Sequence, residues 1–155
     1  MKITKKLSLV LVIILLILSL FGCGAKEAKT PEEFKSFMEG KGFTVVDSTL
    51  FAQDIIKADT VLTALGDNYE IDYYELSTQT GASSLFELNK EAFENEETAV
   101  NLTTHLSSDN FDYYSLVSDT GFHMTARVDN TVVYCYTDAE YKDEIVELIT
   151  ELGYK

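Results

Sequence analysis

A cysteine and two histidines are the side chains in this sequence best suited to nucleophilic or metal chemistry. A thiolate nucleophile needs a base within hydrogen-bond reach, and we expect only His123 and Cys135 to lie on neighbouring strands. The dipeptide Asp129-Asn130 is typical of a two-residue hairpin loop, which places Met124 opposite Cys135. His123 then projects from the other side of the sheet. We therefore predict that Cys135 is a small buried residue.

The sequence does not indicate a metal or cofactor site. Metal sites usually take three or four ligands at characteristic spacings, and His105 and His123 belong to no His-x-x-x-His or His-Glu-x-x-His pattern. The acidic residues at 94–97 and 109–112 lack the Asp-x-Asp-x-Asp-Gly loop that binds calcium. The glycines at 40 and 42 are not followed by the Lys-Ser/Thr of a phosphate loop. We predict no metal and no cofactor.

The remaining candidate is a tyrosine-rich face of the predicted sheet. Strand alternation assigns to one face the core residues Phe111, Tyr113, Val117, Phe122, Met124, Ala126, Val128, Val133 and Cys135. Tyrosine is common at binding surfaces, so the opposite face is a candidate binding face, with Arg127 paired to Asp112. Its members are Tyr74, Tyr114, His123, Arg127, Tyr134 and Tyr136. Alternatively, the tyrosines are good strand formers on a solvated face.

The first 23 residues have the pattern of an export signal. Residues 1–6 hold three lysines and no acid, and residues 7–21 are apolar except for two serines. This run is shorter than the roughly 20 residues that cross a ~30 Å hydrocarbon core. It ends at Leu20-Phe21-Gly22-Cys23.

That ending resembles the lipobox of bacterial prolipoproteins, although Phe21 is bulkier than the usual residue. The resemblance implies that diacylglycerol is attached to the thiol of Cys23 and that a peptidase cuts between Gly22 and Cys23. It also implies a lipid-anchored protein on the extracytoplasmic face of the cell membrane, with membrane lipid as a partner. Two or three acyl chains hold a protein firmly, whereas one binds only marginally. The alternative is an uncleaved helical anchor.

Composition bounds what the exported part can be. Cleavage removes 22 of the 155 residues and leaves 133, enough for one modest core. The three lysines lost with the signal lower the net charge from −14 to −17. This acidity argues against nucleic acid as a partner. We predict a signal peptide at 1–22, a lipidated tether at 23–29 and a single domain at 30–155.

The pattern of the domain predicts an α+β fold with two layers, an antiparallel sheet carrying helices on one face. Thr30 and Glu33 predict a capping box at the first helix. Asp67-Asn68 and Asp129-Asn130 predict two hairpins at an offset of 62. Helices are expected at 82–94 and 140–152, with a second capping box from Thr137 and Glu140. The inward side of the first of these helices is expected to carry Ala82, Leu85, Phe86, Ala92 and Phe93. We interpret this order as a duplicated βββα unit, about 43–95 and 111–153, after an N-terminal helix.

These observations favour a non-enzymatic interaction module that binds an envelope protein or component. Its layout is loosely similar to that of small uncharacterised lipoproteins of low-GC Gram-positive bacteria, a resemblance that implies no activity. Two alternatives stay open. One is a solute-binding component that works with a transporter, and the other is a hydrolase whose carboxylates come together only on folding.

Overall fold

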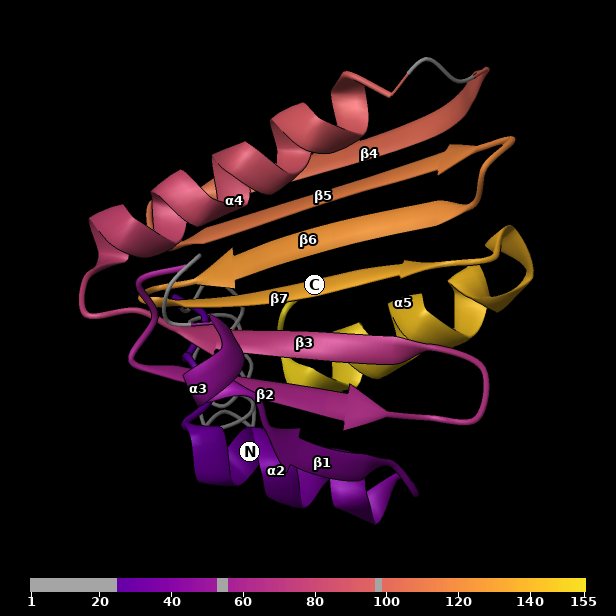
Figure 1. Ribbon diagram of the computed structural model, residues 1–155. Coiled ribbons are helices and arrows are strands. Elements are labelled where there is room, and N and C mark those ends of the chain that lie inside the picture. The colour runs from indigo at the N-terminus through magenta and orange to yellow at the C-terminus, as the bar shows by residue number, and fades with distance from the viewer. Residues whose placement is uncertain (1–24, 53–55, 97–98) are drawn as a thin grey trace, which may run out of the picture.

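The computed structural model describes residues 25–52, 56–96 and 99–155 (Figure 1). The predicted signal peptide and Cys23 lie outside the described residues. None of the described helices is long and apolar enough to cross a membrane.

Seven antiparallel strands form one sheet in the order β1-β2-β3-β7-β6-β5-β4. The α+β class is therefore confirmed. The strands are β1 (Thr44–Asp47), β2 (Thr60–Leu65), β3 (Glu70–Glu75), β4 (Val100–Ser108), β5 (Phe111–Ser118), β6 (Phe122–Val128) and β7 (Thr131–Thr137). The helices are α2 (Pro31–Gly40), α3 (Thr49–Ala52), α4 (Gln79–Glu94), η1 (Ala139–Tyr141) and α5 (Lys142–Leu152).

The two predicted hairpin loops set the register of the central strands. Asp129 adopts a positive φ of 51°, and the loop pairs Met124 with Cys135 as predicted. At the other hairpin, the Gly66 amide donates to the Tyr69 carbonyl at 3.0 Å, which closes a loop at Asp67-Asn68. The strand alternation deduced from the sequence is therefore confirmed.

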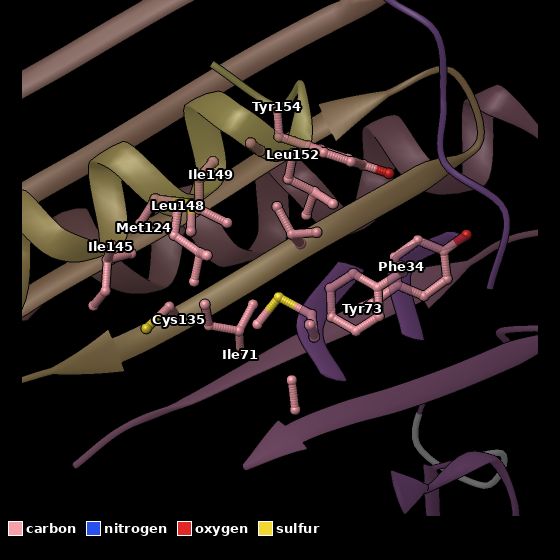
Figure 2. Packing of buried hydrophobic residues seen from close by; sticks show 14 of the residues in the cluster. Phe34, Ile71, Tyr73, Met124, Cys135, Ile145, Leu148, Ile149, Leu152 and Tyr154 are labelled. Atoms are coloured by element: carbon pink, nitrogen blue, oxygen red, sulfur yellow. The ribbon is translucent and has the colours of Figure 1, made fainter. Parts of the chain in front are cut away.

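The main core lies between one face of the sheet and the helices α2 and α5. Phe34 of α2 stacks on Tyr73 of β3 with ring centroids 4.8 Å apart. Figure 2 shows the α5 side chains packed over Met124 and Cys135 of the sheet. The capping box of α2 is present, because the Glu33 amide donates to Thr30 and the Thr30 amide donates to the Glu33 carboxylate. The fully buried residues common to this core include Phe34, Met38, Ile71, Tyr73, Met124, Cys135, Ile145, Ile149 and Tyr154.

The prediction that all helices lie on one face is wrong. Helix α4 crosses the opposite face, over β5, β6 and β7 (Figure 1), so the sheet has a helical layer on both sides. The reason is that this second face is itself apolar. Its Leu116 and Val132 are buried beneath Phe86 and Leu85 of α4. The two βββα units are therefore not equivalent in space, since α4 and α5 lie on opposite faces.

Three smaller expectations are also corrected. The sequence analysis assigned no strand to residues 100–108, where the structure has β4. Thr137 and Glu140 form no capping box; Asp138 precedes η1 without a capping side chain. Ala92, expected to face inward, is exposed.

The predicted tether is bound to the domain over residues 25–29. The Lys26 ammonium donates to the carbonyls of Gly153 (3.3 Å) and Lys155 (2.8 Å). The Asn110 amide donates to the Lys26 carbonyl at 2.7 Å, and the Tyr73 hydroxyl donates to the Lys29 carbonyl at 2.6 Å. These contacts satisfy backbone carbonyls of the segment and of the C-terminal residues, and they hold residues 25–29 at one end of the sheet.

Candidate functional site

The predicted tyrosine-rich face exists, but it is covered. Register pairs Tyr114 with Thr125, Thr125 with Tyr134 and Tyr134 with Asp72, so these side chains share one face. Phe93 of α4 lies on it, with its ring centroid 6.5 Å from Tyr114 and 5.6 Å from Tyr134. The prediction of an open binding face is therefore wrong, because α4 turns most of it into a second core.

The tyrosines of this face have different environments. Tyr74 and Tyr114 are buried and Tyr134 is partly buried. Burial raises the pKa of all three phenols. Tyr136 is 48% exposed, and its hydroxyl donates to the Thr120 carbonyl at 3.2 Å. Tyr136 alone among the predicted binding residues presents a large exposed surface.

Arg127 forms the predicted cross-strand pair with Asp112. The Arg127 Nε donates to a carboxylate oxygen of Asp112 at 2.7 Å, and Nη1 donates to the Asp129 carbonyl at 3.2 Å. The carboxylate also accepts a hydrogen bond from the Ser107 hydroxyl. Arg127 is buried and engaged within the domain, so the pair fixes strands β4, β5 and β6 together.

His123 is enclosed where the end of α4 meets β6 and β7. Its ring stacks on Tyr136 (4.4 Å between centroids) and lies 4.9 Å from Phe93. Nε2 is 3.3 Å from a Glu96 carboxylate oxygen. Neither ring nitrogen makes a well-aligned hydrogen bond within the described residues. Burial lowers the pKa of His123, and the nearby Glu96 carboxylate opposes that shift in part.

The structure places His123 and Cys135 on opposite faces, as the strand alternation predicted. Cys135 is fully buried in the main core, where burial is the main cause that raises the pKa of its thiol to about 12. A thiol with so high a pKa carries almost no nucleophilic thiolate at neutral pH. The two residues therefore cannot act together.

A groove with a volume of about 500 Å³ lies between α2 and strands β1 to β3. The Thr60 hydroxyl donates to a Glu75 carboxylate oxygen there at 3.2 Å. The lining includes no histidine, cysteine or serine, so it holds no Ser–His or Cys–His pair. Within the described residues, no three His, Cys, Asp or Glu side chains gather as a metal site would require. The groove lining is Thr30, Pro31, Glu32, Lys35, Val45, Asp47, Thr60, Leu62 and Glu75.

The edge strand β4 is the surface that the sequence analysis missed. It is nine residues long, and β5 is its one neighbour in the described sheet. No residue from 100 to 108 carries a formal charge. From Leu102 to Ser108 the pairing with β5 is regular, after an irregularity between Val100 and Leu102.

Leucines of β4 are exposed on one side of this edge. Leu102 and Leu106 are 54% and 43% exposed and lie on the face opposite α4. His105 points to the other face, where its ring lies 5.9 Å from that of Tyr114 and 6.5 Å from that of Phe86. The strand is thus supported from the α4 side and open along its edge and its leucine face. The β-branched residues Val100, Thr103 and Thr104, which favour strands, were the signal that could have revealed it.

The other edge of the sheet, at β1, differs from the β4 edge in length, charge and covering. Strand β1 has only four residues and ends in the charged Asp47, and α2 and β2 pack beside it. Short edge strands and charges on them are common ways in which proteins prevent edge-to-edge pairing. Strand β4 carries no such guard over Leu102 to Ser108, which makes it the candidate interaction site.

Comparison of the chain with protein-family models, curated proteins and solved structures found no match.

Proposed function

We propose that this chain is an extracytoplasmic lipoprotein, anchored through acylated Cys23, whose domain binds an extended segment of another envelope protein along β4. It acts as an interaction module and not as an enzyme. The observation that carries the binding half of this proposal is the long, uncharged and unguarded edge strand. The anchoring half is supported by the sequence Leu20-Phe21-Gly22-Cys23 after a short apolar run.

Strand addition explains why such an edge is retained. The outer N–H and C=O groups of an edge strand can pair with an extended chain, and main-chain hydrogen bonds then supply affinity. Side chains that alternate along the added strand supply specificity. Leu102 and Leu106 lie four residues apart on one face, where they offer apolar contacts to side chains of the added strand on that same face.

Charge favours a different protein over a second copy as the partner. Two copies of a domain with a net charge of −17 repel each other. Carboxylates flank β4 at both ends: Asp109 follows it directly, and Glu96 and Asp119 lie at the far end near its first residues. The complementary partner segment is therefore extended and uncharged in its middle, and it carries lysine or arginine at its two ends.

The test is photo-cross-linking in the native envelope from a probe at Thr104, in the middle of β4. We expect an adduct with one partner protein, mapped to an extended segment of the chemistry given above. Leu106→Lys places a cation on the binding edge and should weaken the adduct about tenfold, which corresponds to about 1.4 kcal/mol of binding free energy.

Leu88→Lys is the matched control, because Leu88 is also exposed (62%, against 43% for Leu106) but lies on α4. It should leave the adduct unchanged. An adduct that survives Leu106→Lys, or a chain cross-linked only to a second copy of itself, would contradict the proposal.

A further inference from the structure

The end of the sheet that holds residues 25–29 is tied to the position of the lipid anchor. The Lys26 ammonium lies 4.5 Å from the centroid of the Phe111 ring, at the start of β5, in addition to its hydrogen bonds to the C-terminal carbonyls. Three peptide units separate Lys26 from Cys23, and a fully extended chain spans at most ~3.6 Å per residue. The Cα atom of an acylated Cys23 therefore lies at most about 11 Å from that of Lys26, which keeps the bilayer close to this end of the sheet.

A protruding apolar tip lies at this same end of the sheet. Leu50 and Phe51 of α3 are 84% and 86% exposed, the two most exposed large apolar side chains in the described part of the chain. The register places α3 there: β1 ends at Asp47, directly before α3, and the antiparallel pairing brings this end beside Thr60 and Glu75. Figure 1 shows α3 at the end of the sheet where β5 and β7 begin.

The same pairing continues across the sheet to the bound N-terminal segment. Glu75 pairs with Thr131, Thr131 with Val128, and Val128 with Phe111, the residue under Lys26. Five strand-to-strand steps of about 4.8 Å separate β1 from β5, so the tip and the anchor point are about 24 Å apart along one end of the sheet. Two contacts this far apart are enough to restrict the orientation of the domain on a surface.

Resting on the proposed lipid anchoring, we infer that Leu50 and Phe51 insert into the lipid bilayer as a second contact. The occupant of this apolar tip is the lipid surface, because the short chain between Lys26 and Cys23 brings that surface to this end of the domain. A body with a net charge of −17 gains nothing from anionic headgroups, so uncharged apolar side chains are the suitable means of contact. Inserted together, the tip and the anchor hold the strands upright on the bilayer.

The chain contains no tryptophan, which permits a direct test. The mature lipidated protein carrying Phe51→Trp is placed in phosphatidylcholine vesicles with and without brominated acyl chains. We expect a blue-shifted emission and at least a twofold loss of intensity with the brominated lipid. Leu65→Trp is the matched control, since Leu65 is partly exposed but pairs with Thr44 at the opposite end of the sheet. Its emission should show neither effect.

Flotation of the same vesicles distinguishes a failure of the lipid anchoring from a failure of the inferred insertion of Leu50 and Phe51. A protein that floats but whose Phe51→Trp variant is quenched no more than the Leu65→Trp variant overturns this inference alone. A protein that does not float overturns the lipid anchoring and the inference with it. Emission that is blue-shifted yet insensitive to brominated lipid shows that protein covers the tip, either a second copy or another partner, and also overturns the inference.

Discussion

At the scale of single residues, this protein keeps its most reactive side chains out of reach. Cys135 is fully buried in the main core and His123 is enclosed on the other face. Both environments disfavour the charged form of the side chain, since burial penalises charge. Cys135 and His123, which looked most suited to chemistry, therefore serve packing. The exposed side chains of the β4 edge and the α3 tip include leucine, threonine and phenylalanine.

Cys135 should be protected from thiol reagents in the folded protein. Its burial and a pKa raised to about 12 leave very little thiolate near neutral pH. Labelling with a bulky maleimide at pH 7 should be at least about a hundredfold slower in the native protein than in denaturant, because it requires unfolding of the core. Comparable rates in both states would show that the thiol is accessible and that the described packing is wrong.

His123 should make the fold less stable in mild acid. Because burial lowers its pKa below the ordinary 6.5, the unfolded chain takes up a proton more readily than the folded protein. Stability is thus fully present above pH 6.5 and decreases as the pH falls toward the lowered pKa of the folded state. Thermal unfolding between pH 7 and 5.5 should therefore show a smaller decrease in Tm for His123→Gln than for the wild type.

His105→Gln is the control for that measurement, because it removes an exposed histidine on β4. Its decrease in Tm should match that of the wild type. If the Tm of His123→Gln decreased as much as that of the wild type, protonation of the His123 ring would have no cost in the folded state.

At the scale of elements, α4 is the helix that decides which surfaces are available. Its Phe86 and Phe93 bury the tyrosine-rich face, and its Asn89 amide donates to the Thr125 hydroxyl at 3.2 Å. Without α4 the predicted binding face would be open. With it, the exposed apolar surfaces of the described residues include the β4 edge and the α3 tip.

Phe93→Ala tests this role of α4. Removing a buried phenylalanine costs about 3 to 5 kcal/mol in the free energy of unfolding, and the loss should be visible in urea denaturation. Leu88→Ala, on the exposed side of the same helix, should change that free energy by less than about 0.5 kcal/mol. A loss below about 1 kcal/mol for Phe93→Ala would show that the helix is not packed on the tyrosines.

Local sequence signals predicted those elements whose geometry is set by local contacts. A two-residue loop at Asp129-Asn130 fixes which residues oppose each other, so the faces of β6 and β7 followed from it. Thr30 and Glu33 cap α2 through bonds within one turn. The side of the sheet that α4 covers could not be deduced in this way. Helical periodicity predicts that one face of a helix is buried. Which of the two apolar faces of the sheet the helix covers depends on tertiary packing.

The candidate site was less predictable than the fold for a related reason. An edge position is a property of the strand order, which no pattern within residues 100–108 contains. Leu50 and Phe51 fall in a stretch whose pattern gave no clear element, and their exposure depends on where β1 ends. The tyrosines, in contrast, were conspicuous by residue type alone, although the packing of α4 on strands β3, β5, β6 and β7 decides whether they are exposed to solvent.

At the scale of the whole molecule, the proposed anchor joins an acidic domain to a membrane through one short segment that is bound to the fold. Residues 25–29 are part of the fold, so an anchor at Cys23 leaves the domain little freedom to swing away from the lipid. In this arrangement the long edge strand has a fixed direction relative to the membrane, running from the far end of the sheet at Val100 to the proposed lipid-facing end at Ser108. Such a fixed edge suits the capture of an extended segment from a neighbouring envelope protein.

The acylation of Cys23 is the premise of this arrangement, and intact-mass spectrometry of the native protein from its own membranes tests it most directly. We expect a mature chain that begins at Cys23, has lost residues 1–22 and carries the added mass of a diacylglyceryl group. The Cys23→Ala variant should retain the leader and gain no lipid. A native protein recovered from the soluble fraction with Met1 in place and no acyl mass would contradict the account.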